Sequence, residues 1–256
     1  MQNNNKYNEG IKKNMIPKKI YYCWFGGKPL PKMAIKCINS WKKYLKDYEI
    51  VEINENNFDV SQNIYTKEAY ENKKFAFVTD YVRLYVLYNN GGIYMDTDVE
   101  VIKNLDEFLV HTAFSGFENE NFVPTGIMAS EQNNKIVKEL LDYYDNRHFV
   151  LNDGTLDLTT NTEIITNIFK QKGLVMNNKK QIIDGFALYP NDYFCPVSHE
   201  DHKLKKTINT YTIHWFAGSW IPAKDKIKIK TYQFAKKILG ERTLKKTINL
   251  FRKEKK

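Results

Sequence analysis

The pattern that most restricts the fold lies near the start of the chain, where two strand-like segments flank a helical one. Lys19 to Phe25 reads K-I-Y-Y-C-W-F and ends at Gly26-Gly27, as a buried strand running into a turn does. Tyr48 to Ile53 predicts a second strand. Between these two segments a helix is predicted, because apolar residues recur at helical spacing at Met33, Cys37, Trp41 and Tyr44. Such a unit folds with a right-handed crossover and a parallel strand pair, which predicts an α/β domain.

The rest of the chain continues this alternation of helices and strands. A helix is predicted over 75–88, where apolar residues recur at helical spacing before Gly91-Gly92, a pair suited to an αL helix stop. Further helices are predicted through Leu140 and Tyr144 and over 162–171. Short strands are predicted over 93–95 and 211–216. This order favours one α/β domain with a mixed sheet, and the sequence contains no internal repeat.

The charge of the chain is concentrated at one end. The formal net charge is +9, yet the segment 223–256 alone holds thirteen Lys and Arg against three Asp and Glu. A nucleic-acid enzyme is expected to spread basic surface over its folded domain, so a nucleic-acid partner is not predicted. We therefore expect a flexible arm over 1–15, a catalytic domain over 16–222 and a basic, amphipathic helical tail over 223–256, a pattern also typical of helices that lie on anionic membranes.

Two observations bear on location and on cysteine chemistry. The sequence contains no run of about 18 apolar residues, and its start lacks the apolar stretch of a secretory signal. A cytoplasmic protein is therefore expected. Cys23, Cys37 and Cys195 are an odd number without C-x-x-C spacing, which favours three buried free thiols over disulfides or a zinc site.

The sharpest motif is G-G-I-Y-M-D-T-D-V-E, residues 91–100. In an extended chain residues i and i+2 point to the same face, so Asp96 and Asp98 are expected to project together from a strand end. Two carboxylates aimed at one point favour a hard cation such as Mg²⁺ or Mn²⁺, whose remaining ligands would be water and a diphosphate. The alternative is an acidic turn on a solvated surface.

Three further motifs offer polar or aromatic groups. Asp80 and Arg83, three residues apart in an apolar helix, either form a plain helix ion pair or bind sugar hydroxyls and phosphate. Trp24 offers either a face to a nucleobase or a core side chain. In T-I-H-W-F-A-G-S-W, residues 212–220, His214 is either a metal ligand or a core histidine, and further donors follow it.

Taken together and in this order, these motifs resemble glycosyltransferase family 32, the sugar transferases with a D-x-D motif found in bacterial capsule and surface-polysaccharide loci. That family in turn resembles the catalytic domains of large clostridial glucosylating toxins. The similarity covers roughly Ile16 to Pro222 and includes I-P-K-K-I-Y-Y-C-W-F-G-G-K-P-L-P at the start. It implies a GT-A fold, a nucleotide-sugar donor, with a uridine diphosphate sugar favoured by family habit, a divalent cation and transfer with retention of anomeric configuration.

The resemblance also implies roles for individual residues. It places Trp24 and Phe25 at the nucleobase, Asp80 and Arg83 at the donor sugar, and Asp96 at the ribose, sugar or phosphate. It places Asp98 at the metal, and Ser219 and Trp220 at the β-phosphate on a closing loop. The toxins have a Glu metal ligand shortly before the loop Trp, whereas this sequence has no acid over 212–220, so His214 is the substitute expected. Asn161 and Glu163 either face the acceptor or simply follow a Thr N-cap.

Other functions were weighed against this interpretation. D-T-D-V also fits the D-x-D-x-T/V of haloacid-dehalogenase-type phosphatases, but there the motif ends the first strand and an acidic pair follows downstream, which is not the case here. A non-catalytic carbohydrate- or nucleotide-binding module would not need all these motifs together. A glycosyltransferase effector that modifies host proteins keeps the same chemistry. The acceptor favoured is a saccharide, in some such systems linked to a membrane lipid.

Overall fold

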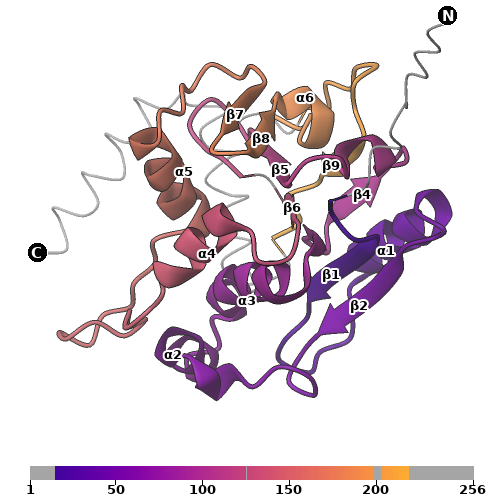
Figure 1. The fold of residues 1–256 in the computed structure, drawn as a ribbon. Coiled ribbons are helices and arrows are strands. Elements are labelled where there is room, and N and C mark those ends of the chain that lie inside the picture. Colours follow the sequence, from indigo (N-terminus) through magenta and orange to yellow (C-terminus); the bar gives the residue numbers. More distant parts are fainter. Residues whose placement is uncertain (1–14, 125, 199–202, 219–256) are drawn as a thin grey trace, which may run out of the picture. The chain divides into compact units, whose positions relative to one another are not determined.

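The computed structural model describes residues 15–124, 126–198 and 203–218 (Figure 1). All of them except Gly218 belong to one compact unit, which ends at Ala217. The predicted arm over 1–15, apart from Met15, and the predicted basic tail lie outside the described residues. The two boundaries between the three predicted segments therefore remain predictions.

One mixed sheet organises the described part of the chain. Its strands are β1 (Lys19–Cys23), β2 (Glu49–Ile53), β3 (Gly92–Met95), β5 (Ala113–Gly116), β6 (Ile127–Ser130), β7 (Gln181–Ile183) and β8 (Phe186–Tyr189). They are ordered β2-β1-β3-β6-β5-β8-β7. The pairs β1/β2, β1/β3 and β5/β8 are parallel, whereas β6 runs antiparallel to both β3 and β5. The β7/β8 pair at the far edge is also antiparallel.

Helices and short helical turns cover this sheet. They are α1 (Lys32–Tyr44), η1 (Val60–Gln62), α2 (Ile64–Glu71), α3 (Phe75–Asn90), η2 (Asp106–Phe108), α4 (Lys135–Asp142), α5 (Asn161–Gln171) and α6 (Asn191–Phe194). Two short strands, β4 (Val99–Val101) and β9 (Thr212–His214), form a separate antiparallel ribbon.

Alternate residues of the central strands enter two different cores. Tyr21 and Cys23 of β1 pack with α2, α3, α4 and α5 in one cluster. Ile20 and Tyr22 of the same strand pack with α1, α6 and the β4 ribbon in the other. Because both faces are covered, the strands read as continuous apolar runs rather than as alternating ones. The helices on the two sides of the sheet can be followed in Figure 1.

The predicted α/β architecture, with a Rossmann-like mixed sheet flanked by helices, is confirmed. The opening strand-helix-strand unit and its parallel pair are present as predicted. Two details differ. The helix predicted through Tyr144 ends at Asp142, although Tyr144 is buried beyond it. Gly91 caps α3 with φ 64° and ψ 177°, so it has the positive φ that favours glycine but an extended ψ rather than the αL value.

Candidate functional site

The strand order brings four chain segments to one edge of the sheet. Because β1 and β3 are parallel, both end at this edge, and Asp96 follows β3 directly. Since β6 runs the opposite way, it begins there, and the Asp96 N–H donates to the Gly126 carbonyl at 2.8 Å just before it. β5 ends at the same edge, and Glu118 lies two residues beyond it. The carboxyl ends of parallel strands are where α/β proteins commonly bind ligands.

The two carboxylates of the D-x-D motif converge through a turn and not through an extended strand. Asp96 already lies outside β3, and Thr97 and Asp98 form a turn before β4. The Val99 N–H donates to the Asp96 carbonyl at 3.0 Å, which closes this turn. Thr97 is buried, while both carboxylates are partly accessible. The prediction that the two aspartates share one site is supported, but its geometric reason was wrong.

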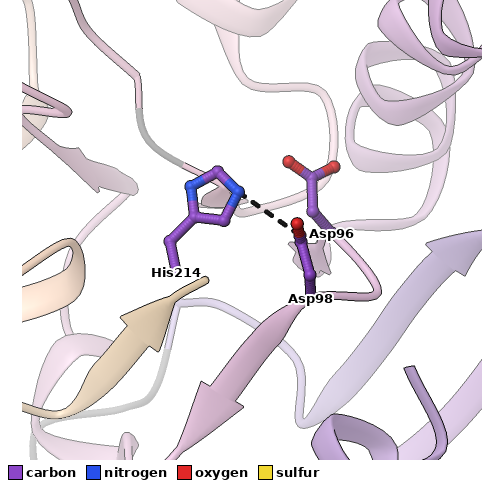
Figure 2. Close-up of side chains that lie close together, drawn as sticks. All are labelled: Asp96, Asp98 and His214. Atoms are coloured by element: carbon purple, nitrogen blue, oxygen red, sulfur yellow. Dashed lines mark ion pairs between the residues drawn. The ribbon is translucent and has the colours of Figure 1, made fainter. Parts of the chain in front are cut away.

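His214 completes a cluster with the two aspartates (Figure 2). It is 7% exposed and is paired with Val99 in the β4/β9 ribbon, which places it beside the turn. Its Nε2 lies 3.3 Å from Asp98 Oδ1. One ligand atom from each of the three residues lies within 4.8 Å of the other two. His214 is thus both buried and beside the acidic pair, and its role as a metal ligand stays a prediction.

Hydrogen bonding and charge hold Asp98 in its ionised form. Its Oδ2 accepts the Ala217 N–H at 2.7 Å, and its carbonyl accepts the Trp215 N–H at 3.0 Å. Burial alone would raise the pKa of Asp98, but the charge and hydrogen bond of His214 together with the Ala217 N–H lower it. For His214, burial lowers the pKa, yet the Asp98 carboxylate raises it well above its usual value. Both shifts favour an ion pair in which His214 is protonated and Asp98 is ionised.

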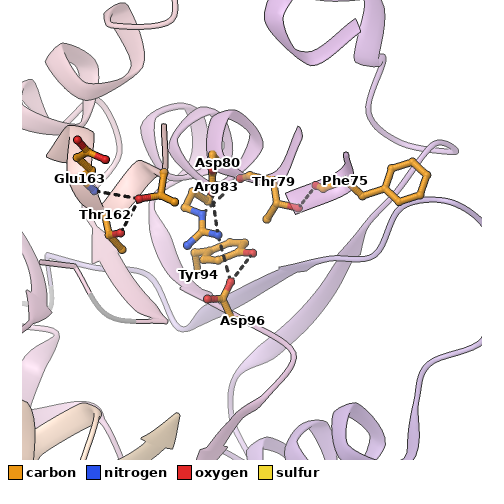
Figure 3. A network of polar contacts seen from close by, with 9 residues as sticks. Phe75, Thr79, Asp80, Arg83, Tyr94, Asp96, Thr162 and Glu163 are labelled. Atoms are coloured by element: carbon orange, nitrogen blue, oxygen red, sulfur yellow. Dashed lines mark hydrogen bonds and ion pairs between the residues drawn. The ribbon is translucent and has the colours of Figure 1, made fainter. Parts of the chain in front are cut away.

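A buried ionic network lies next to this cluster (Figure 3). Arg83 and Asp80, on α3, are only 8% and 7% exposed, and their charged atoms are 3.4 Å apart. The Arg83 guanidinium also lies 3.2 Å from Asp96 Oδ1 and over the Tyr94 ring at 4.5 Å. The Tyr94 hydroxyl donates to Asp96 at 3.1 Å. Arg83 thus bridges two carboxylates, which is more than the plain helix ion pair weighed as its alternative.

The N-terminus of α5 lies against the same network. Thr160 caps this helix and accepts the Glu163 N–H at 3.4 Å, so the N-cap alternative is what the structure shows. Glu163 is exposed. Asn161 is 6% exposed, and its Nδ2 has no hydrogen-bond partner among the described residues. Burial raises the pKa of Asp80 to about 7 with a contribution from Asp96, while Arg83 and a hydrogen bond from the Asn161 backbone oppose the rise.

This pKa leads to a prediction about stability in metal-free buffer containing a chelator. An unfolded Asp loses its proton near pH 4, whereas native Asp80 retains its proton up to about pH 7. Between these values the native state binds more protons, so the contribution of Asp80 to stability falls as pH rises from about 4 to 7. Asp80→Asn removes this titration. We expect the melting temperature of the variant relative to the native protein to increase with pH, measured by thermal melts from pH 5 to 8.

The matched control for this experiment is Asp142→Asn on α4. Asp142 is exposed and pairs with Lys138 in the same helix. Its melting temperature relative to the native protein is expected to stay constant over the same pH range. A constant difference for Asp80→Asn as well would contradict the raised pKa.

One acidic residue at this edge was missed by the sequence interpretation. Burial raises the pKa of Glu118 to about 7; His214 and Arg83 oppose this rise, whereas Asp96 and Asp98 add to it. Glu118 therefore lies within electrostatic range of the whole cluster. The pattern that could have identified it is an acid directly after a short buried strand of small and apolar residues, A-F-S-G-F-E. Recognising its importance also required knowing that β5 ends beside β3.

The residues predicted at the nucleobase lie in different surroundings. Trp24, just after β1, is partly exposed, and its indole N–H donates to the Lys28 carbonyl. Phe25 is 6% exposed and makes edge-to-face contacts with Phe58 and Tyr70 at centroid distances of 6.3 and 6.5 Å. The Phe25 ring therefore belongs to the core, and Trp24 is the better placed of the two. Ser219 and Trp220 lie outside the described residues, so their predicted roles are untested.

The chain is similar to several known proteins. It is 26% identical over 232 residues to an uncharacterized glycosyltransferase of Acanthamoeba polyphaga mimivirus, covering 81% of this chain and 85% of that protein. Among solved structures, it is similar to the PaToxG glycosyltransferase with 21% identity and a TM-score of 0.46, over 62% of this chain and 70% of that one. It is also similar to the galactosyltransferase LgtC with 12% identity and a TM-score of 0.42, over 78% and 88%.

A family assignment comes from the sequence itself. The sequence model of a family described as capsular polysaccharide synthesis protein matches residues 1–152, which is more than half of the chain. The matched region includes the opening strand-helix-strand unit, the Asp80–Arg83 helix and the D-x-D turn. The chain belongs to the capsular polysaccharide synthesis protein family.

Proposed function

We propose that this protein is a retaining, metal-dependent glycosyltransferase of the GT-A type. It transfers a hexose or N-acetylhexosamine from a nucleotide-diphosphate sugar, with uridine diphosphate favoured, to a saccharide acceptor in surface-polysaccharide synthesis. The observation that carries this proposal is the Asp96–Asp98–His214 cluster beside the buried Asp80–Arg83 network. Membership in the capsular polysaccharide synthesis protein family and the glycosyltransferase names of its relatives support it. The finer relationship to glycosyltransferase family 32 and the toxins is part of the same proposal.

The donor set suits a divalent cation. Two carboxylates and one imidazole are acceptable ligands for Mn²⁺, and carboxylates with water suit Mg²⁺. One ligand atom from each of the three residues lies within 4.8 Å of the other two, so these side chains could converge on one cation. A bound cation would supply electrostatic stabilisation of the diphosphate leaving group. Cation binding would also release the proton from His214.

The chain's own residues would divide the remaining work. Arg83 and Asp80 would bind hydroxyls of the donor sugar, since a guanidinium and a carboxylate can each form two hydrogen bonds. Arg83 would also hold Asp96 in place through their 3.2 Å contact. Trp24 would contact the base, and Ser219 and Trp220 would close over the β-phosphate. Backbone and side-chain donors of this kind stabilise developing negative charge when they are positioned in advance.

The experiment that tests the proposed function is a panel of nucleotide sugars incubated with Mn²⁺. Release of nucleoside diphosphate without an acceptor is measured first, because it reports donor, metal and reaction class together. The anomeric configuration of the released sugar, followed by NMR at early times, tests retention. Release from no member of the panel, with or without added saccharides, would contradict the proposal. Phosphate release from simple phosphomonoesters instead would favour a phosphatase.

Gly126 gives a structural test of the metal site. A Cβ built on this glycine lies 2.9 Å from Val99 Cγ2 and 3.1 Å from both Asp96 Oδ2 and His214 Cε1. Gly126→Ala is therefore expected to push the two ligands apart. We expect Mn²⁺ affinity in the presence of UDP, measured by electron paramagnetic resonance, to fall about tenfold or more, with a stability cost of about 1–3 kcal/mol from overpacking.

Gly154→Ala is the control for this variant. A Cβ at Gly154 meets nothing within 4 Å, although its φ of +79° makes any side chain strained. It should lose some stability and keep its Mn²⁺ affinity. If Gly126→Ala bound Mn²⁺ as tightly as Gly154→Ala does, the cation would not lie between Asp96 and His214.

We further propose that the basic segment 223–256 contacts anionic membranes, where a lipid-linked acceptor would be concentrated. None of the helices in the described ranges is long and apolar enough to cross a bilayer. The proposal rests on the many Lys and Arg residues of this segment. Each Lys or Arg near an anionic surface contributes on the order of 1 kcal/mol to membrane binding. Co-sedimentation with anionic liposomes is expected to require residues 223–256 and to be lost at high salt. Equal binding by a protein truncated after residue 222 would contradict it.

A further inference from the structure

An open pocket lined by four polar residues and one leucine lies in the connection between α4 and α5. Its volume is about 270 Å³, and it is lined by Arg147, His148, Leu151, Asn152 and Asp157. This is just below the range of sites for drug-sized ligands, which leaves room for one sugar unit. None of these five residues belongs to the motifs described above. The pocket is separate from the cluster of Asp96, Asp98 and His214.

The segment that forms the pocket is folded back on itself and anchored. The Leu151 N–H donates to the Thr155 carbonyl, and the Asp157 N–H donates to the Phe149 carbonyl, both at 2.8 Å. Glu68 on α2 accepts the backbone N–H groups of Phe149 and Val150 at 2.7 and 2.9 Å. The pocket walls are therefore fixed before any ligand arrives, which lowers the entropic cost of binding.

Two of the lining residues present unused hydrogen-bonding capacity. Glu68 also contacts His148 Nδ1 at 2.8 Å, and the His148 side chain is 58% exposed, which leaves its other ring nitrogen toward solvent. Arg147 pairs with Asp157 through one terminal nitrogen and lies over the Tyr143 ring at 4.6 Å. The buried Arg147 Nε has no hydrogen-bond partner among the described residues.

Charge at the pocket is balanced at Arg147, which pairs with Asp157, while the ring of His148 hydrogen-bonds to Glu68. A ligand with a strong net charge would be attracted by one member of the Arg147–Asp157 pair and repelled by the other. A neutral ligand with many hydroxyl groups fits better, because it can donate to carboxylates and accept from Arg147, His148 and the Asn152 amide. Leu151, 44% exposed, adds an apolar surface for the carbon face of a sugar ring.

The pocket lies close to the candidate donor site along the chain. Asp157 accepts the Thr159 N–H at 3.1 Å, and Asn161, four residues after Asp157, supplies the backbone hydrogen bond to Asp80. Four residues span at most about 14 Å even when fully extended. Burial raises the pKa of Tyr65, and the charges of Asp80 and Asp157 both add to that rise. This buried tyrosine therefore lies within electrostatic range of both the candidate donor site and the pocket.

We propose that this pocket binds a neutral sugar unit of the acceptor saccharide, at a distance from the reacting hydroxyl. The inference rests on the proposed function for its biological meaning, because only a glycosyltransferase has an acceptor to hold. The binding itself is a property of the pocket and is measured independently of transfer. Its specificity for an uncharged saccharide follows from the pairing of Arg147 with Asp157.

The test uses the full-length protein and four probes: the methyl glycosides of glucose, galactose and N-acetylglucosamine, and methyl glucuronide as the anionic comparison. Binding is measured by saturation-transfer NMR and by titration. At least one neutral glycoside is expected to bind. Asn152→Ala and His148→Ala are each expected to weaken it about three- to tenfold, the effect of losing one hydrogen bond. Gln171→Ala, an exposed amide at the opposite end of α5, is the control and should bind as the native protein does.

Three results would overturn the proposal: no binding by any glycoside, unchanged affinity in both pocket variants, or tighter binding of the glucuronide than of the neutral glycosides. Thermal melts of the variants exclude loss of fold as the cause of weaker binding. Nucleoside diphosphate release from the donor panel is measured separately. Neutral glycoside binding without any such release would support the pocket and contradict the proposed function, so the two failures are distinguishable.

Discussion

Asp98→Asn is expected to reduce Mn²⁺-dependent release of nucleoside diphosphate by a factor of about a hundred to a thousand. This is the loss seen when one preorganised electrostatic contact to a developing charge is removed. The amide keeps the size of Asp98 and can still accept the Ala217 N–H, so the turn should remain folded. It loses the negative charge that pairs with His214 and that a cation requires. Initial rates over a Mn²⁺ titration measure the effect.

Glu100→Gln is the matched control, because Glu100 lies on β4 only two residues after Asp98. Glu100 pairs with Lys36 at 2.7 Å and accepts the Trp215 indole N–H at 2.9 Å, so it belongs to the ribbon and not to the cluster of three. Loss of the Glu100 charge should leave the dependence of the release rate on Mn²⁺ unchanged. Calorimetric titration of Mn²⁺ in the presence of UDP separates loss of binding from loss of turnover. Native rates in Asp98→Asn would contradict the role of Asp98 as a metal ligand, without affecting the description of the fold.

The parts of the site that follow from local sequence were predictable. The D-x-D motif stands out because an apolar strand and two glycines precede it, and the Asp80–Arg83 pair stands out because its helix is otherwise apolar. Each of these needs only the helical period or the position of a strand end. The opening parallel pair was predictable for the same reason, since the crossover rule needs only the order of elements.

The parts that depend on strand order were less accessible. Glu118 is 22 residues after Asp96 in the sequence, and it reaches the cluster only because β6 and β5 follow β3 in the sheet. Local patterns do not specify that order. Similarly, the contact between His214 and Asp98 depends on the register of β9 against β4. The resemblance indicated His214 as a metal ligand, whereas its distance from Asp98 required the fold.

The convergence of Asp96 and Asp98 was predicted for the wrong geometric reason. Their convergence was predicted from the two-residue period of an extended strand. The structure reaches the same convergence by ending β3 at Met95 and turning at Thr97 and Asp98 into β4. The turn also directs the chain away from the sheet, where β4 pairs with β9 and binds α1 through the Trp41 indole, which donates to the Val99 carbonyl at 2.7 Å. The turn therefore brings the acidic pair and His214 together.

Arg83→Met is expected to lower the free energy of unfolding by about 3–5 kcal/mol, the cost of removing one partner from a buried ionic network. Met keeps the apolar length of the side chain and its packing against Tyr94. It leaves the carboxylates of Asp80 and Asp96 without the Arg83 guanidinium, which lies 3.4 Å from the first and 3.2 Å from the second. Because Arg83 opposes the rise in the pKa of Asp80, the loss should be larger at pH 8 than at pH 5.5. Urea unfolding at both pH values measures it.

The double variant Asp80→Asn with Arg83→Met tests whether the cost arises from an unpaired charge. If it does, removing the Asp80 carboxylate should restore part of the stability lost in Arg83→Met. The interaction energy from the double-mutant cycle should then exceed the roughly 0.3–0.5 kcal/mol within which distant, independent sites are additive. Lys138→Met on α4 breaks an exposed pair with Asp142 and is expected to change stability little, because solvent screens that pair. A loss in Arg83→Met as small as that in Lys138→Met would mean that the network beside the D-x-D turn is not held together by Arg83.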